Sequence, residues 1–302
     1  MEERVLNSIE RYVHERTGLC FTGHKKRLLR QRLEERILRL GLADLDTYRK
    51  ILFASDSEGS SLLELLTTNE TFFFRNPRQF DFLMEKIVPA LEDGKGRDVM
   101  HSRVGSSMTP SASSLMKLRI LCAGCSTGEE PYSVAMSLLS TLRYPRAWDI
   151  EILAGDLNES CIRAAEKGFY DEERVKGLPY AFRDRYTEHA SGGLVVTEEV
   201  RRLVRFSVLN LNDIVNGGSF PGVDADFAGF DIIFCRNVMI YFSLPSQQLL
   251  VDLLYRSLLP GGYLFTGDAE PLHLYKHEFA SVRDVRCLIY QKAETGADAR
   301  SV

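Results

Sequence analysis

The spacing of apolar residues changes from a helical to a strand-like period partway along the chain. In the first part, apolar residues recur every three or four positions in LNSIERYVHERTG, HKKRLLRQRLEERILRLG, DLDTYRKILF and SLLELLTTNETFFF. This period is typical of amphipathic helices. Asn76 and Pro77 begin a further apolar pattern and indicate another helix, because both residue types favour a helix N-terminus. The pattern therefore predicts an all-helical N-terminal domain over residues 1–92.

Short apolar runs replace this pattern from residue 117 onward. KLRILC, DIEILAG, LVRFSVL, FDIIFCR, GYLFTGD and VRCLIYQ are typical of buried strands, and helical patterns cover 129–142, 158–167 and 246–259. Strands that alternate with helices predict an α/β fold with a doubly wound, mostly parallel sheet. We expect this domain over 117–295, with residues 177–202 forming an inserted β subdomain.

Composition and the remaining segments complete the domain plan. Residues 93–116 are rich in Ser and Gly and predict a flexible linker, and 296–302 are expected to be a disordered tail. The 302 residues suffice for two domains. The sequence has no apolar run of 18 residues and no apolar export signal at its start, so we expect a cytoplasmic protein without membrane insertion. The six cysteines are scattered, which favours reduced thiols, and we expect no metal site.

Basic charge is concentrated at the start of a chain whose net charge is -4. Residues 1–50 contain 12 Lys and Arg against 8 Asp and Glu. This distribution excludes a general nucleic-acid binder and favours a local acidic partner. Four basic residues project within about 60° of one another on the second predicted helix; they are Lys25, Arg32, Arg36 and Arg39. A solvated, salt-bridged helix face remains an alternative, because acids occur in the same helix.

A glycine turn joins the first predicted strand to the next helix in RILCAGCSTGEEPYSVAM. Ligands of open α/β sheets bind at the carboxyl ends of the strands, where this turn lies. A phosphate site would need a lysine or bare helix N–H groups, whereas Glu129 and Glu130 occupy the helix start. One alternative is that both acids only stabilise the helix dipole and bind no ligand. The functional alternative is a cationic ligand without phosphate, such as S-adenosylmethionine.

A second acid, Asp156, ends the next predicted strand in EILAGDLN. A carboxylate at this position can accept hydrogen bonds from both hydroxyls of a ribose. It can equally act as the N-cap of the following helix. Together with the glycine turn and the acidic helix start, Asp156 favours an adenosyl cofactor.

Five motifs together resemble the CheR family of chemotaxis receptor methyltransferases. They are LTTNETFFFRNPRQF, CAGCSTGEEPYSVAM, GDLN, LNL and DIIFCRNVMIYF, and the similarity extends from about residue 5 to 292. The resemblance implies a helical domain followed by a Rossmann-like methyltransferase domain with an inserted β subdomain. It implies S-adenosylmethionine as cofactor and S-adenosylhomocysteine as product, with the methyl group going to receptor glutamates. The chain departs from the family in reading GDAE where members commonly have a His-Ser-Glu run.

The resemblance also implies roles for individual residues. The cofactor contacts would be Asn69, Thr71, Arg75, Glu130, Asp156, Asn210, Leu211, Arg236 and Asn237. Arg75 and Tyr241 would lie closest to the reacting methyl group. The basic face formed by Lys25, Arg32, Arg36 and Arg39 would dock the acidic methylation helix of a chemoreceptor.

The sequence therefore leads to one main hypothesis and two alternatives. The main hypothesis is a cytoplasmic, monomeric protein-glutamate O-methyltransferase that acts on the cytoplasmic helices of methyl-accepting chemoreceptors. The first alternative is a regulatory module of the same fold that binds cofactor or receptor without turnover. The second is a nicotinamide oxidoreductase that uses the same glycine turn.

Overall fold

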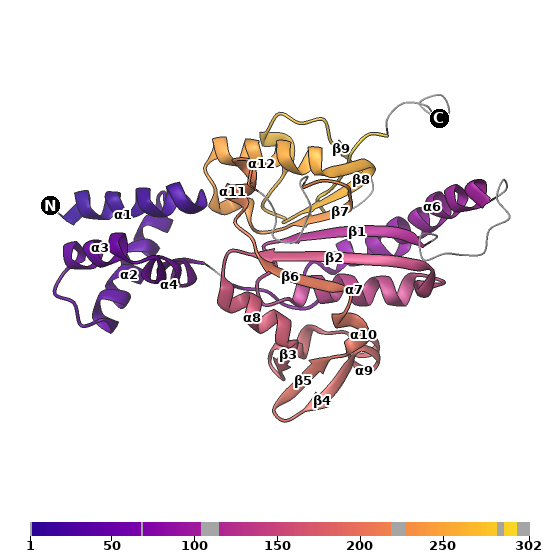
Figure 1. The fold of residues 1–302 in the computed structure, drawn as a ribbon, viewed down its shortest axis with the longest axis horizontal. Coiled ribbons are helices and arrows are strands. Elements are labelled where there is room, and N and C mark those ends of the chain that lie inside the picture. The colour runs from indigo at the N-terminus through magenta and orange to yellow at the C-terminus, as the bar shows by residue number, and fades with distance from the viewer. Residues whose placement is uncertain (1, 68, 104–114, 219–226, 283–286, 295–302) are drawn as a thin grey trace.

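The computed structural model describes residues 2–67, 69–103, 115–218, 227–282 and 287–294. Figure 1 shows a helical domain at one end of the molecule and a larger α/β domain beside it, with a small β subdomain projecting below. None of the helices in these ranges is long and apolar enough to cross a membrane.

Four helices build the N-terminal domain. They are α1 (Glu2–Thr17), α2 (His24–Arg39), α3 (Leu45–Ala54) and α4 (Asp56–Leu66). Asp44 and Ser55 cap α3 and α4 by accepting hydrogen bonds from the backbone N–H of Thr47 and Glu58. The apolar positions of the sequence pattern form one core, which includes Leu6, Ile9, Val13, Leu29, Leu33, Tyr48, Leu52 and Leu62. The helical prediction is confirmed for this part of the chain.

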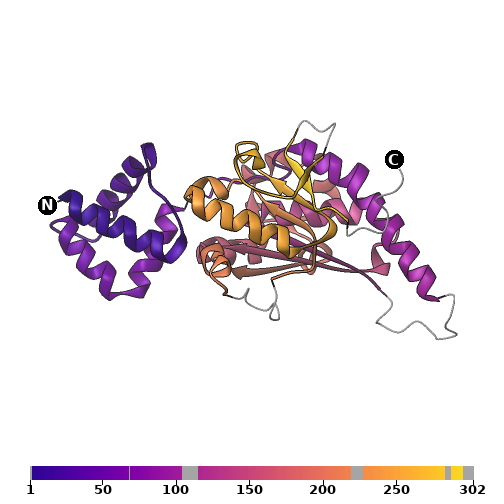
Figure 2. The same ribbon diagram turned by 90° about the horizontal axis from the view of Figure 1, so that it is seen from above.

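The predicted domain boundary at residue 92 is wrong. The core of the helical domain ends at Leu66, and the following helices pack on the other domain. These helices are α5 (Pro77–Phe82), η1 (Leu83–Ile87) and α6 (Val88–Arg103). Helix α6, which reaches away from the sheet in Figure 2, also replaces the first part of the linker predicted over 93–116. Residues 104–114 of that linker lie outside the described residues, as does the predicted tail.

The α/β domain contains one mixed sheet in the order β6-β2-β1-β7-β8-β10-β9. The first five strands are parallel, while β10 is antiparallel to both of its neighbours. The strand bounds are β1 (Met116–Ala123), β2 (Trp148–Asp156), β6 (Val204–Val208), β7 (Phe230–Cys235), β8 (Leu258–Thr266), β9 (Ala280–Ser281) and β10 (Ile289–Gln291). The chain leaves β1 toward β2 and later returns to its other side as β7. This reversal creates the crevice at the carboxyl end of β1 where ligands of such sheets bind.

Both faces of the sheet are buried, as the continuous apolar strands predict. Alternate residues of β1 show this, because Ile120 and Cys122 enter one core and Leu121 and Ala123 enter the other. The covering elements are α7 (Glu129–Thr141), α8 (Glu159–Lys167), α11 (Leu211–Val215) and α12 (Leu244–Ser257). Short 3-10 turns occur at η3 (Pro145–Ala147), η5 (Met239–Tyr241) and η6 (Leu272–Leu274).

The inserted β subdomain is a three-stranded antiparallel sheet in the order β3-β5-β4. Its elements are β3 (Phe169–Asp171), η4 (Arg174–Gly177), α9 (Tyr180–Tyr186), β4 (Thr187–Ala190), β5 (Gly193–Val196) and α10 (Glu198–Arg201). The insertion predicted over 177–202 is therefore present but begins earlier, because β3 pairs with β5 directly after α8.

Candidate functional site

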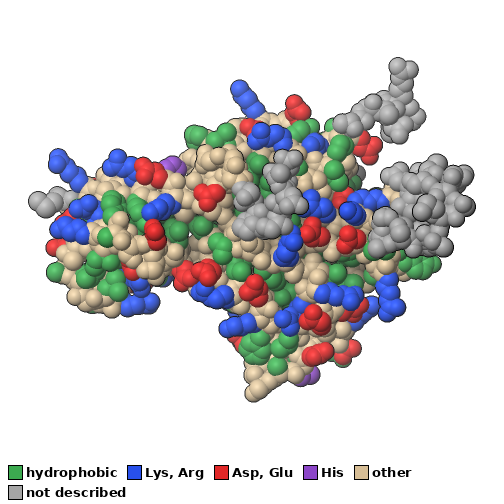
Figure 3. Space-filling view, in the orientation of Figure 1, with side chains coloured by type: hydrophobic (Ala, Val, Ile, Leu, Met, Phe, Trp, Pro, Cys, Tyr) green, Lys and Arg blue, Asp and Glu red, His purple; other side chains and the backbone are tan. Residues whose placement is uncertain are grey.

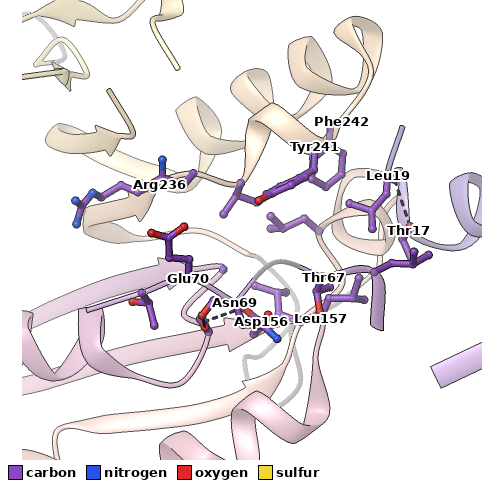
Figure 4. Close-up of a pocket in the computed structure, with 18 of the residues that line it drawn as sticks. Thr17, Leu19, Thr67, Asn69, Glu70, Asp156, Leu157, Arg236, Tyr241 and Phe242 are labelled. Carbon is purple, nitrogen blue, oxygen red and sulfur yellow. Dashed lines mark hydrogen bonds between the residues drawn. The ribbon is translucent and has the colours of Figure 1, made fainter. Parts of the chain in front are cut away.

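A pocket opens at the carboxyl ends of β1, β2 and β7, between the two domains (Figure 4). Three parts of the chain line it: the end of α1 and the start of α2, the segment that joins the domains, and the strand-end loops of the sheet. All of the residues predicted to contact a cofactor lie on its wall: Asn69, Thr71, Arg75, Glu130, Asp156, Asn210, Leu211, Arg236 and Asn237.

The turn after β1 needs glycine for close approach. Gly124 has a φ of 78°, and a Cβ there would lie 2.2 Å from a methyl carbon of Val238. The N–H groups of Gly124 and Cys125 donate to the Gly155 carbonyl, and the N–H of Ser126 donates to Asp156 at 2.8 Å. These donors are already used, so the turn does not offer them to a phosphate. Phosphate binding at this turn is therefore disfavoured by the lack of free N–H donors at Gly124, Cys125 and Ser126 as well as by the nearby acids.

The two adjacent acids at the start of α7 point to different places. Glu129 is fully buried and does not line the pocket; it pairs with Arg174 at 2.9 Å and accepts a hydrogen bond from Thr127 at 2.7 Å. Burial raises its pKa, and Thr127 and Arg174 oppose this shift. Glu130 lines the pocket instead. Of the two acids at the helix start, only Glu130, the one predicted to contact the cofactor, lines the pocket.

Glu130 forms the electrostatic centre of the pocket together with Arg236. Their side chains pair at 2.9 Å, and the Arg236 side chain is only 1% exposed. Burial raises the pKa of Glu130, while Arg236 opposes the shift. Arg236 also donates to the carbonyl of Arg75 at 2.5 Å and to the side chain of Asn76, which in turn donates to Asp268. Arg236 therefore ties the strand-end loop to the segment between the domains.

Asp156 presents its carboxylate at the end of β2. One oxygen accepts a hydrogen bond from Ser126 N–H at 2.8 Å and the other accepts one from Asn158 N–H at 2.9 Å. Burial raises the pKa of Asp156, and these N–H groups oppose the shift. The side chain that caps α8 is Asn158, so the alternative role of Asp156 as the N-cap is wrong. The carboxylate lines the pocket with lone pairs that can accept further hydrogen bonds.

Arg75 and Tyr241 reach the pocket from separate elements. Arg75 donates to the Glu70 carbonyl at 2.9 Å. Tyr241 belongs to η5, and Figure 4 shows its hydroxyl directed into the pocket across from Asn69 and Asp156. Both side chains therefore line the same pocket.

The helical domain closes one side of the pocket, which the sequence did not predict. Leu19 and Phe242 form an isolated antiparallel bridge, and the N–H of Cys20 donates to the carbonyl of Tyr241 at 2.8 Å. Asn210 donates its amide N–H to the Arg16 carbonyl at 2.6 Å. Additional lining residues from this side are Thr17, Leu19, Cys20, Phe21 and Leu28, and Glu70 adds a carboxylate from the segment between the domains.

The four residues of the predicted basic face do not share one environment. Lys25 lines the pocket and donates to the carbonyl of Ile240. Arg36 binds Glu58 through two hydrogen bonds of 2.9 and 2.6 Å, so its assignment to an exposed docking face is wrong. Arg32 pairs with Glu35 at 3.3 Å on the surface, and Arg39 is exposed. Figure 3 shows Lys and Arg side chains over the helical domain, interspersed with acids.

The lining residues fit an adenosyl cofactor without phosphate. Asp156 can accept ribose hydroxyls, Leu157 and Leu209 offer apolar surface to a base, and Glu130 supplies negative charge. The described residues contain no group of three His, Cys, Asp or Glu that could hold a metal ion. The thiols of Cys122 and Cys125 have pKa values raised by burial, which disfavours the thiolate.

Comparison with known proteins gives two family matches. The family model described as "CheR methyltransferase, SAM binding domain" matches residues 69–287, and "CheR methyltransferase, all-alpha domain" matches residues 5–67. These matches confirm the predicted S-adenosylmethionine cofactor and the predicted order of a helical and a methyltransferase domain.

Curated relatives carry related names. The "Probable biofilm formation methyltransferase WspC" of Pseudomonas aeruginosa is 34% identical over 268 residues, which cover 89% of this chain and 57% of the relative. "Chemotaxis protein methyltransferase" of Escherichia coli is 34% identical, covering 87% of this chain and 82% of the relative. "Chemotaxis protein methyltransferase 2" of Vibrio cholerae is 31% identical, covering 94% and 91%. The chain thus spans little more than half of the first relative and most of the other two.

A solved structure, "The structure of PKMT2 from Rickettsia typhi in complex with AdoHcy", is similar with a TM-score of 0.30 at 16% sequence identity. The match covers 49% of this chain and 20% of that one.

Proposed function

Because this chain belongs to the CheR methyltransferase family, we propose that it methylates glutamate side chains of methyl-accepting chemoreceptors. The observation that carries the proposal is one pocket lined by Arg75 and Tyr241 together with Glu130, Asp156 and Arg236. S-adenosylmethionine, when bound, supplies an electrophilic methyl group and leaves as S-adenosylhomocysteine.

The acceptor needs no general base. A glutamate side chain with an ordinary pKa of about 4.3 is ionised at neutral pH. One of its carboxylate oxygens forms the new bond to the methyl carbon while the carbon–sulfur bond breaks and its electron pair stays on sulfur. No proton moves. The protein's task is therefore to hold the carboxylate in line and to exclude water.

Arg75 and Tyr241 are suited to hold the acceptor. Within the described residues, Arg75 gives one N–H to the Glu70 carbonyl and forms no ion pair, so other N–H groups of its guanidinium remain for a carboxylate. The Tyr241 hydroxyl can donate one further hydrogen bond. Because both contacts withdraw electron density from the attacking oxygen, we propose that they orient the acceptor rather than activate it.

We propose that the receptor helix approaches along the helical domain, at the pocket edge where Leu28 lies. Arg32 and Arg39 remain on the surface of α2 to attract acidic residues. On this proposal the protein acts in the cytoplasm, as a monomer, and recognises the methylation helix directly. The curated relatives are named for both chemotaxis and biofilm formation. We therefore propose a receptor carboxylate as the methyl acceptor and assign no pathway.

Transfer of a labelled methyl group to receptor-containing membranes tests the proposal. We expect label that is released by mild base, as a carboxyl methyl ester requires. A protein that binds S-adenosylhomocysteine but transfers no label to any receptor would instead be a regulatory module of this fold. Binding of NAD in place of S-adenosylhomocysteine would favour the oxidoreductase alternative.

A further inference from the structure

Glu270 is a buried carboxylate outside the pocket. It lies in the loop after β8 and is 2% exposed. One of its oxygens accepts hydrogen bonds from the N–H of Asn237 at 2.6 Å and of Gly267 at 2.8 Å, and the other accepts one from Ile240 at 3.2 Å. Burying a charge lowers stability unless hydrogen bonds compensate it, so three N–H donors aimed at one acid indicate a dedicated support.

Two of the three N–H groups that bind Glu270, those of Asn237 and Ile240, belong to the loop after β7. Arg236, Asn237 and Tyr241, all from this loop after β7, line the pocket. Asn237 has a φ of 59°, a left-handed conformation that residues other than glycine seldom adopt without support. The hydrogen bond from its N–H to Glu270 supplies such support.

Gly267 shows how closely the acid and the loop fit together. A Cβ at this position would lie 2.7 Å from the bonded oxygen of Glu270 and 2.9 Å from the backbone nitrogen of Asn237. Neither contact leaves room for a side chain. The close approach therefore depends on glycine at 267 and on an acceptor at 270.

We propose that Glu270 is a positioning residue for methyl transfer. Its carboxylate fixes the loop so that Asn237 faces the cofactor and Tyr241 faces the acceptor. Glu270 does not line the pocket, so it acts through these two residues and not by contact. The inference deepens the proposed function and rests on it, since Asn237 and Tyr241 have their roles only in that reaction.

The variant Glu270→Gln tests this role. It keeps the size of the side chain but removes the charge and turns an N–H donor toward a backbone N–H. We expect the dissociation constant for S-adenosylhomocysteine, measured by calorimetry, to rise by about tenfold to a hundredfold, the usual effect of a small misplacement in a site. We expect kcat to fall as well.

Asp231→Asn is the matched control. Asp231 is 5% exposed and lies near the start of strand β7, at the end opposite to the loop after β7. It accepts a hydrogen bond from the N–H of Arg119 at 2.9 Å and pairs with Lys95 at 2.6 Å. Both variants should lower the melting temperature, but only Glu270→Gln should weaken the binding of S-adenosylhomocysteine. Equal weakening by the control would overturn the proposal, as would a dissociation constant for Glu270→Gln within about twofold of wild type.

A double-mutant cycle with Tyr241→Phe separates positioning from general destabilisation. If Glu270 acts through Tyr241, Glu270→Gln should reduce kcat less in the Tyr241→Phe background than in wild type. Equal reductions in both backgrounds would contradict a role through Tyr241. Should Glu270→Gln not fold, Glu270→Asp carries the same test, because it keeps the charge but shortens the reach. If the wild-type protein binds no S-adenosylhomocysteine, the proposed function itself is refuted. If the wild-type protein binds it and Glu270→Gln changes neither the affinity nor kcat, only this inference is refuted.

Discussion

Two buried Arg–Glu pairs, one in each domain, show how the same contact can serve structure or function. In the helical domain, Arg36 pairs with Glu58 at 2.6 Å, and at the pocket Arg236 pairs with Glu130 at 2.9 Å. Both pairs are largely buried, and in each one the arginine makes more than one hydrogen bond. The chemistry of the contact therefore does not tell which pair belongs to a site.

The surroundings of the two carboxylates make the difference. Burial pushes the pKa of Glu58 up, but Arg36 and the Tyr48 hydroxyl outweigh it, so the pKa is lowered. Burial raises the pKa of Glu130, and Arg236 offsets this only in part. Glu58 is thus fully paired inside one domain, whereas Glu130 faces a pocket with interactions still to be made. A pair that leaves its acid incompletely compensated beside a cavity is the one to examine for function.

The largest effect that this comparison predicts comes from removing the two arginines. Arg236→Met leaves Glu130 buried without its partner and should cost about 3–5 kcal/mol of stability or binding. It should also weaken the binding of S-adenosylhomocysteine by about a hundredfold or more, because the loop loses its hydrogen bonds to Arg75 and Asn76. Arg36→Met should lower the melting temperature and leave the affinity unchanged. Calorimetry below both melting temperatures checks this, and weaker binding by Arg36→Met would remove the distinction.

Adding one methyl group at a glycine should also separate the two regions. Gly124→Ala places a Cβ against Val238, so the turn after β1 must shift and S-adenosylhomocysteine should bind about tenfold more weakly. Gly41 has a similar φ of 65°, but a Cβ there would meet no atom of the described residues within 4 Å. Gly41→Ala should therefore cost only about 1–2 kcal/mol of backbone strain. Titration and thermal unfolding of both variants measure the difference, and unaltered affinity in Gly124→Ala would contradict the assigned site.

Two tyrosine hydroxyls give a finer comparison. Tyr241→Phe removes a hydrogen bond worth about 1.4 kcal/mol, so kcat should fall about tenfold while the affinity for S-adenosylhomocysteine stays near that of wild type. Tyr48→Phe removes the hydroxyl that donates to Glu58 at 2.8 Å and should change stability alone. Initial rates of methyl transfer test both. Unchanged turnover in Tyr241→Phe would take Tyr241 out of the mechanism.

The smallest expected effect is a difference in pH dependence. The lowered pKa of Glu58 means that its contribution to stability is present above the ordinary carboxyl pKa of about 4.3 and is lost as the pH falls through the lowered value. Glu130 behaves oppositely, because its raised pKa favours the protonated form in the folded state, with a contribution that is lost as the pH rises through the raised value. As the pH falls from 7 into acid, the difference in unfolding free energy between wild type and Glu58→Gln should therefore shrink, whereas the difference between wild type and Glu130→Gln should shift in favour of wild type. Parallel curves would show that the two acids do not differ.

Much of the site could be predicted because its residues lie in short motifs next to strand ends. Glu130, Asp156, Arg236 and Asn237 all reach one pocket because parallel strands bring their carboxyl ends to the same edge. The sequence could also predict that only one of Glu129 and Glu130 faces the ligand, because neighbouring residues of a helix point about 100° apart.

Other features depend on contacts between distant parts of the chain. Arg36 shares a helix face with Arg32, but its partner Glu58 comes from another helix, and nothing local signals the pairing. The helical period continues past residue 66, so the sequence could not tell which core Phe80 and Ile87 join. Closure of the pocket by Thr17 to Phe21 likewise arises only when the domains meet.

A crystal structure with S-adenosylhomocysteine tests the assigned site most directly. We expect the product in the crevice beyond β1 and β2, with its ribose hydroxyls on Asp156 and its sulfur within reach of Arg75 and Tyr241. Density for the product elsewhere, or a sulfur atom turned away from Arg75 and Tyr241, would contradict this assignment.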